Sequence, residues 1–168
     1  SQMPTRASYN LFTAYATLKA IEDNKIDWGT RVAKASGNDG SFTSGTVEQA
    51  MERMIVNSDN AAASALRTNS RIGTPDEVNS LLHKAGLSDK TVMGSGNAGD
   101  AAGTNTKSTA NDYVKFLVLL EERKLPGLSN DDYYTKLLGY MKHATTDAGS
   151  ARSGIIAGVK GCTVPFKP

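Results

Sequence analysis

Apolar residues recur along most of this chain at intervals of three and four positions, the spacing of a helix that packs one face against a core. The first such segment spans residues 11–23, with apolar residues at positions 11, 14, 15, 18 and 21. Comparable patterns predict further helices over residues 46–56, 59–67, 74–85, 109–124 and 130–144. Only the short stretches RVA (31–33), TVM (91–93) and CTV (162–164) favour strands. The pattern therefore predicts a mainly helical fold with at most short strands.

Polar residues that can cap a helix stand at the start of most of these segments. T-V-E-Q at Thr46 is a capping-box pattern, and T-P-D-E at Thr74 is a cap with proline at the first helical position. The other predicted caps are Ser58 or Asp59, Ser108 or Thr109, and Ser129. Residues 94–107 carry four glycines and are predicted to be a loop. We expect one helical domain over residues 1–168, with long ordered loops.

The composition is that of a globular protein and argues against several kinds of partner. The 168 residues are 39% hydrophobic and 21% charged, with a formal net charge of +2. A charge that small, without a basic cluster, does not indicate a nucleic-acid partner. No apolar run approaches the roughly 18 residues of a membrane span. Because no segment has the pattern of a signal peptide, we expect a cytosolic chain or a mature or trimmed form.

The residues that most often bind metals are scarce. The chain has one cysteine, Cys162, and two histidines, His83 and His143. None of them forms a pair with the spacing of a metal site. We therefore expect no metal and no other cofactor.

The triplet Ser58-Asp59-Asn60 stands at the seam between two apolar segments and has two interpretations. It can be a plain helix cap, because these residue types are favoured at the N-cap. It can also be one wall of an active site. A serine becomes nucleophilic only with a base close by and with donors for the developing oxyanion. One known arrangement combines S-x-x-K on one helix face, S-x-N opposite it, and K-T-G on a strand.

Several segments together resemble one family. The stretch IVNSDNAAASAL is similar to the S-D-N element of the penicillin-recognising serine hydrolases, which include class A β-lactamases and D,D-peptidases. PTRASYNLFTAYATLKAIEDNKIDW resembles the segment that carries S-x-x-K, about 50 residues before S-D-N. TNTKSTANDYVKFLVLLEERKL resembles the later T-x-A-x-D helix, and ARSGIIAGVKGCTVPFK the approach to K-T-G. The resemblance follows the family's order over nearly the whole chain.

This resemblance implies a fold, a site and a location. It implies the helical lobe of the β-lactamase/transpeptidase-like fold, with the strands of the sheet lobe largely absent from the chain. By the family's pattern, Ser58 would relay protons, Asn60 would hold the substrate amide and Lys167 would hold the substrate carboxylate. The implied substrates are β-lactams or D-alanyl peptides, attacked by a serine. The implied location is outside the cytoplasm of a bacterium.

The sequence departs from the family at the nucleophile and its base. In the family's register the serine of S-x-x-K falls on Ala7 and the lysine on Asn10. Ser8 is present, but one place late, which is about 100° around a helix. An amide cannot act as a general base, and residues 94–107 contain no glutamate for deacylation. The sequence therefore predicts a catalytically inactive member of the family, with Ser8 as a remnant or candidate nucleophile only.

Two alternatives remain for activity and partners. The chain can be an active serine hydrolase whose missing parts are supplied by another chain. As an inactive domain, it is expected to bind cell-wall peptide or a β-lactam, or to associate with itself or a complementing chain. Without a sheet lobe, the face of the first helix with Leu11, Phe12 and Tyr15 is predicted to be exposed and to form that contact.

Overall fold

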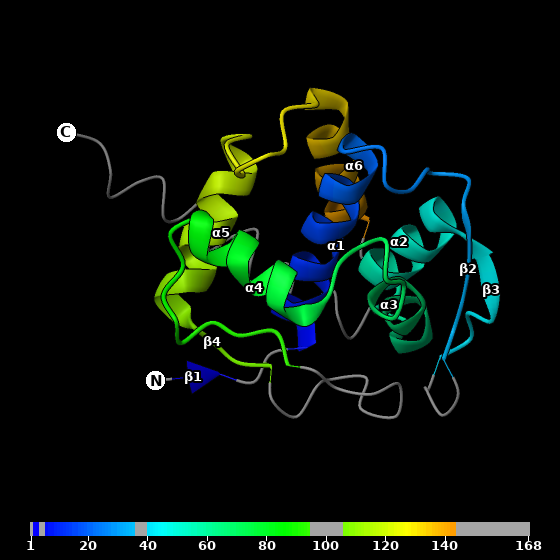
Figure 1. Ribbon diagram of the computed structural model, residues 1–168, viewed down its shortest axis with the longest axis horizontal. Helices are drawn as coiled ribbons and strands as arrows, with labels where there is room; N and C mark the ends of the chain where they lie inside the picture. The colour runs from blue at the N-terminus through cyan, green and yellow to red at the C-terminus, as the bar shows by residue number, and fades with distance from the viewer. Residues whose placement is uncertain (1, 4–5, 36–39, 95–105, 144–168) are drawn as a thin grey trace.

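Six helices and two short strand pairs make up the part of the chain that the computed structural model describes, residues 2–3, 6–35, 40–94 and 106–143. Figure 1 shows helix α1 in the middle, with α2 and α3 on one side and α4 and α5 on the other. The prediction of a mainly helical fold is confirmed. In chain order the elements are β1 (Gln2–Met3), α1 (Arg6–Glu22), β2 (Arg31–Ala33), β3 (Ser44–Thr46), α2 (Val47–Val56), α3 (Asn60–Arg67), α4 (Pro75–Lys84), β4 (Ser108–Thr109), α5 (Ala110–Glu121) and α6 (Asp131–Lys142).

Helix α1 is enclosed on all sides along most of its length. Residues 9–18 are all buried, including the polar Asn10, Thr13 and Thr17. A helix that is buried all round has no polar stripe, so its apolar period is weak. The sequence pattern nevertheless identified the helix from residue 11 onward; it missed the start at Arg6 because residues 6–10, R-A-S-Y-N, include few large apolar side chains.

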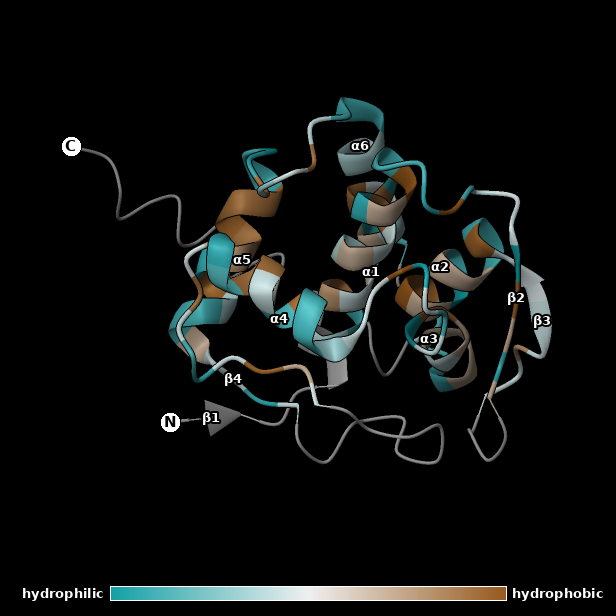
Figure 2. Cartoon of the chain, in the orientation of Figure 1, coloured by the Kyte–Doolittle hydropathy of each residue, from teal (hydrophilic) through white to brown (hydrophobic). Residues whose placement is uncertain are grey.

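The aromatic face of α1 packs against α5 and not against a second molecule. Leu11, Phe12 and Tyr15 are 5%, 1% and 0% exposed. Phe12 meets Phe116 of α5 edge to face, with ring centroids 5.0 Å apart, a favourable geometry for aromatic pairs. Figure 2 shows that α5 is strongly hydrophobic over its later half. The prediction that this face is an exposed dimer contact is therefore wrong, because the chain's own α5 covers it.

Most helices begin at the caps that the sequence predicted. The hydroxyls of Thr46 and Thr74 accept hydrogen bonds from the third residues of α2 and α4, and the side chains of those residues accept from the cap N–H groups. Both are therefore complete capping boxes. Of the open alternatives, Asp59 caps α3 and Thr109 caps α5.

The last helix is the exception to the predicted caps. Asn130, and not Ser129, caps α6. The N–H group of Ser129 instead donates to the carboxylate of Glu22 at 2.9 Å, and the N–H of Asn130 donates to the same carboxylate at 2.7 Å. Glu22 is the last residue of α1, so this contact docks the start of α6 against the end of the central helix. No local sequence pattern reports a contact of this kind.

The strands are short and lie at the edges of the helical body. The predicted strand at residues 31–33 is confirmed as β2, which pairs antiparallel with β3, Val32 opposite Gly45. The pair β1 and β4, with Met3 opposite Ser108, was not predicted. The predicted strand at residues 91–93 is wrong, because only Val92 makes a single bridge, to Lys107. The predicted strand at 162–164 lies outside the described residues.

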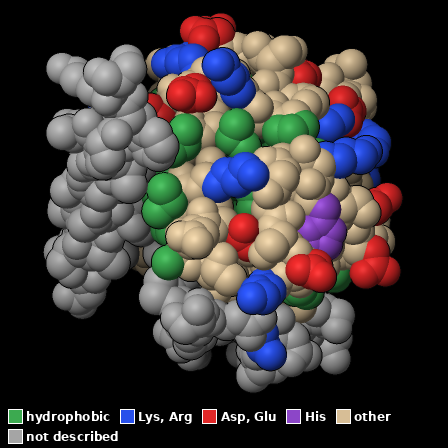
Figure 3. All heavy atoms as spheres, turned by 90° about the vertical axis from the view of Figure 1, so that its left-hand side faces the viewer, with side chains coloured by type: hydrophobic (Ala, Val, Ile, Leu, Met, Phe, Trp, Pro, Cys, Tyr) green, Lys and Arg blue, Asp and Glu red, His purple; other side chains and the backbone are tan. Residues whose placement is uncertain are grey.

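The described surface is mixed in character. On the face seen in Figure 3, hydrophobic side chains form small groups between charged ones. Among the described residues, Val114 is the most exposed large hydrophobic side chain, at 37%. Within the same ranges, no helix combines the length and hydrophobicity needed to cross a bilayer.

Candidate active site

Asp59 organises the corner between α2 and α3. As the cap of α3, its Oδ1 accepts hydrogen bonds from the N–H groups of Ala61 and Ala62 at 2.9 and 3.0 Å. Its Oδ2 accepts from the N–H groups of Ser41 and Phe42 at 3.1 and 3.0 Å, and from the Ser41 hydroxyl at 3.2 Å. Burying a carboxylate is unfavourable unless donors replace the lost water. Five donors do so here, and they tie the loop before β3 to the start of α3.

Gly40 and Arg53 close around the same carboxylate. Gly40 has a φ of 135°, which side chains rarely adopt, and a Cβ at this position would collide with the carboxylate of Asp59. Arg53, in the last turn of α2, places Nη2 3.8 Å from Oδ2 of Asp59 and donates a hydrogen bond to the hydroxyl of Ser41. Because the Arg53 side chain is 44% exposed, the ion pair adds little free energy. The hydrogen bonds to Asp59 therefore dominate this corner.

Ser58 stands at the turn itself, in a strained conformation. Its φ is 53°, in the left-handed region that costs a non-glycine residue about 1–2 kcal/mol. The turn allows α2 to end at Val56 and α3 to begin at Asn60. Ser58 and Asn60 are half-buried, on either side of the buried Asp59. The outer residues of the triplet thus stay accessible, while the middle one belongs to the scaffold.

The second wall of the candidate site is the start of α1. Asn10 is 6% exposed and donates from Nδ2 to the backbone oxygen of Met54 at 3.4 Å. Met54 lies in the last turn of α2, where carbonyl groups lack partners within the helix. The structure thus brings Asn10 against the segment that leads into the S-D-N corner. The amide supplies a donor to a helix end, but it has no lone pair basic enough to remove a proton.

The first turn of α1 preserves the geometry of S-x-x-K without its functional groups. The backbone is helical from Arg6, so Ala7 and Asn10 keep the i, i+3 relation that places two side chains on one face. Ser8 and Asn10 are two residues apart and do not share a face. The side chains of Ala7 and Ser8 lie outside the described atoms. Lys167 lies entirely outside the described residues.

Tyr9 and Arg67 form a contact that the sequence did not reveal. The guanidinium carbon of Arg67 lies 4.3 Å from the centre of the Tyr9 ring, a cation–π geometry. Tyr9 is the fourth residue of α1, and Arg67 is the last residue of α3. The contact joins the helix that carries position 10 to the helix that begins with Asn60. No sequence signal pairs two residues so far apart in the chain.

A second buried carboxylate, Asp112, holds the other side of the molecule. It lies in the first turn of α5 and accepts from the N–H and hydroxyl of Ser88 at 3.0 and 2.6 Å and from the Thr91 hydroxyl at 2.6 Å. Burial alone raises the pKa of Asp112, but the hydrogen bonds from Ser88 and Thr91 outweigh it and hold the pKa below its ordinary value. The only sequence signal was the T-x-A-x-D resemblance, which did not single out this residue.

Comparison with known proteins identifies the family. The model of a family described as the beta-lactamase enzyme family matches residues 1–163, nearly the whole chain. The chain belongs to the beta-lactamase enzyme family. This confirms the resemblance to penicillin-recognising serine hydrolases that the motifs indicated. None of the curated proteins compared with this chain matches it.

Solved structures show the same fold. PBP-A is 19% identical, with a TM-score of 0.72 over 88% of this chain and 56% of its own, and a PBP-A mutant was solved as an acyl-enzyme complex with penicillin G. A beta-lactamase from Chitinophaga pinensis is 14% identical, with a TM-score of 0.70 over 87% of this chain and 58% of its own. Penicillin-binding protein D2 from Listeria monocytogenes, solved in the ampicillin-bound form, is 24% identical, with a TM-score of 0.58 over 70% of this chain and 51% of its own.

The chain spans little more than half the length of these relatives. Its six described helices and short strand pairs correspond to the mainly α lobe of the β-lactamase fold, as the resemblance implied.

Proposed function

We propose that this chain is a β-lactamase-like and penicillin-binding-protein-like domain that does not carry out acyl transfer. The observation that carries the proposal is at position 10. Where S-x-x-K places a lysine, the amide of Asn10 is buried and donates to the Met54 carbonyl. At the nucleophile position of the same motif, Ala7 has no hydroxyl. Loss of a nucleophile or its base removes several orders of magnitude of rate, and loss of both is little worse.

The residues that remain suit reversible binding. The proposal assigns Ser58 and Asn60 to hydrogen bonding with the amide of a β-lactam or of a cell-wall peptide, because both are half-buried beside the rigid Asp59. Lys167 is proposed for the ligand's carboxylate and Ser8 as an inert remnant. Penicillin G and ampicillin, the ligands named for PBP-A and penicillin-binding protein D2, are the natural probes. A location outside the bacterial cytoplasm is part of the same proposal.

Absence of turnover is tested with a chromogenic cephalosporin and a D-alanyl thioester. We expect no hydrolysis above the buffer rate, at any pH between 5 and 9, because Asn10, in the place of the S-x-x-K lysine, cannot act as a base. Sustained turnover by the purified chain would refute the proposal. Turnover that appears only when a second chain is added would favour the alternative of an active hydrolase completed by a partner.

Reversible binding is tested by NMR titration with penicillin G. We expect saturable shifts of the backbone signals of Ser58 and Asn60 that are weakened in Asn60→Ala. The matched control is Asn111→Ala, an exposed asparagine in the first turn of α5. Shifts that are absent, or that respond equally to both substitutions, would remove the binding part of the proposal and leave a purely structural domain.

A further inference from the structure

A surface groove runs between the second half of α1 and the length of α4. Its free volume is about 290 Å³. Two stripes of residues line it from opposite sides, each with the spacing of one helix face: 16, 19 and 23 on the side of α1, and 77, 81 and 84 on α4. Ser58 and Asn60 are not among the lining residues, so the groove is separate from the candidate active site.

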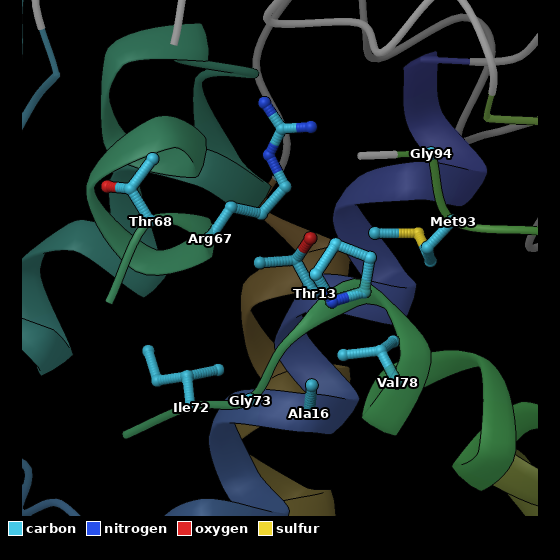
Figure 4. Close-up of a pocket in the computed structure, with 10 residues that line it drawn as sticks. Thr13, Ala16, Arg67, Thr68, Ile72, Gly73, Val78, Met93 and Gly94 are labelled. Atoms are coloured by element: carbon cyan, nitrogen blue, oxygen red, sulfur yellow. The ribbon is translucent and has the colours of Figure 1, made fainter. Parts of the chain in front are cut away.

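The floor of the groove is apolar. Ala16 of α1, Val78 of α4 and Ile72 in the turn before α4 are all buried. Figure 4 shows these three side chains together, with Ala16 between Ile72 and Val78. Leu81 lies one turn further along α4 and is half-buried, so part of its side chain contacts solvent. A ligand with an apolar part would remove this surface of Leu81 from water.

Most of the charges on the rim of the groove already balance one another. Asp23 is paired with Lys19, one turn before it. Glu77 belongs to the capping box of α4 and accepts a hydrogen bond from the N–H group of Thr74 at 2.7 Å. The pKa of Glu77 is lowered, first by the hydrogen bonds to Thr74 and in smaller part by the charge of Lys25. Two lysines of the rim thus lie near its two carboxylates.

Lys84 is the third lysine of the rim. It is exposed at the last position of α4, and no salt bridge joins it to an acidic residue within the part of the chain that the structure describes. Three lysines against two carboxylates leave one positive charge in excess beside the apolar floor. A ligand with one carboxylate and an apolar body matches both features.

The apolar floor also favours a plain hydrocarbon chain over a peptide. A peptide backbone would bring N–H and C=O groups onto Leu81 and the buried side chains around it, where these groups would lose water without gaining partners. A hydrocarbon chain has no such groups.

We propose that the groove between α1 and α4 is a binding site for a small amphipathic carboxylate, a molecule with a straight hydrocarbon chain and a single carboxylate. The chain covers Leu81 and the carboxylate pairs with the ammonium group of Lys84. Because Lys84 is exposed, the ion pair alone contributes little free energy, and binding requires both halves of the ligand. The site is independent of ligand binding at Ser58 and Asn60.

The first test is NMR titration of the full chain with hexanoate. Two control ligands each lack one half of the molecule: 1-hexanol has the chain without the charge, and acetate has the charge without the chain. We expect hexanoate to give saturable shifts of the backbone signals of Leu81 and Lys84, and 1-hexanol to bind about threefold more weakly. No saturable shift with hexanoate, or acetate that binds as tightly as hexanoate, would overturn the proposal.

Substitutions separate the two halves of the site. Lys84→Gln should weaken hexanoate about threefold and leave 1-hexanol unchanged. The matched control is Lys124→Gln, in the loop after α5, where the side chain is 70% exposed and both affinities should stay the same. Leu81→Ala should weaken both ligands, because it removes the apolar contact.

Three outcomes of these titrations would contradict the proposal. The first is unchanged hexanoate binding in the folded Lys84→Gln or Leu81→Ala variant. The second is an equal loss in Lys84→Gln and Lys124→Gln. The third is tighter binding of N-acetyl-leucine than of hexanoate, which would show that the groove takes the end of a peptide.

Discussion

The two walls of the candidate site are held in place by different forces. At the S-D-N corner, Asp59 accepts five hydrogen bonds from two separate segments. At the start of α1, Asn10 donates one hydrogen bond, of 3.4 Å, to the backbone oxygen of Met54, and the helix is fixed instead by buried aromatic packing around Phe12. Asp59 thus contributes to the fold through several hydrogen bonds, whereas Asn10 contributes one long hydrogen bond. The fold alone therefore accounts for the aspartate of S-D-N, through the cap that it provides to α3.

The largest loss of stability is expected from a substitution in the aromatic packing of α1 around Phe12. Phe12→Ala should lower the free energy of unfolding by about 3–5 kcal/mol, because it empties a fully buried aromatic site against Phe116. Urea unfolding at an unchanged m-value measures this. The control, Val114→Ala on the exposed side of α5, should cost about 0.5 kcal/mol or less. A nearly neutral Phe12→Ala would contradict the account that buried aromatic packing fixes α1.

The second-largest loss of stability is expected at the corner between α2 and α3, where Asp59 accepts its hydrogen bonds. Asp59→Ala should lower the free energy of unfolding by about 3 kcal/mol. It removes an N-cap worth about 1 kcal/mol, and it leaves the N–H groups of Ser41 and Phe42, in the loop before β3, without an acceptor. The control is Asp131→Ala, in the first turn of α6, whose side chain is 76% exposed and should contribute about 0.5 kcal/mol. Urea unfolding measures both variants. An equal loss of unfolding free energy in the two would show that the hydrogen bonds to Asp59 do not stabilise the corner.

The pH dependence sharpens the comparison with the second carboxylate. The pKa of Asp112 is lowered in the folded state, so its stabilising contribution is complete above its unfolded pKa of about 3.9. The contribution is lost as the pH falls through the lower, folded-state pKa. In Asp112→Asn this loss is absent, so the stability gap between wild type and variant should shrink as the pH is lowered from 5 to 2. Unfolding curves at several pH values measure the difference in unfolding free energy between wild type and variant. A difference that stays constant or widens as the pH is lowered would contradict the account.

The smallest effect is expected at position 10. Asn10→Ala should cost about 1 kcal/mol, the net worth of one long hydrogen bond between neutral groups. Thermal unfolding of the variant, compared with Asp59→Ala, provides the measurement. If Asn10→Ala proved as damaging as Asp59→Ala, the two walls would not differ and the central comparison would fail.

The parts of the fold that sequence predicted are those with local causes. The capping boxes at Thr46 and Thr74 involve residues three apart, so the sequence alone identifies them. The first turn of α1, residues 6–10, was missed because its sequence, R-A-S-Y-N, has few large apolar residues and so no apolar period. The β1–β4 pairing escaped because each strand is two residues long and its partner is remote in the chain.

The site divides in the same way. The S-D-N triplet can be recognised in the sequence, and the role of its aspartate as the N-cap of α3 follows from the residue types favoured at that position. Two other contacts depend on tertiary structure and leave no periodic pattern in the sequence. They are the hydrogen bonds from Ser41 and Phe42 to Asp59, and the stacking of Arg67 on Tyr9. The assignments of Ser8, Ala7 and Lys167 rest on the family's register and remain predictions.

The most direct measurement is intact-mass spectrometry of the wild-type chain after incubation with penicillin G, followed by peptide mapping. The account predicts an unchanged mass, together with the helical spectrum of a folded protein, because Ala7 and Asn10 provide neither nucleophile nor base. A stable penicilloyl adduct on Ser8 or Ser58 would contradict it, since a serine would then be acylated without the S-x-x-K lysine.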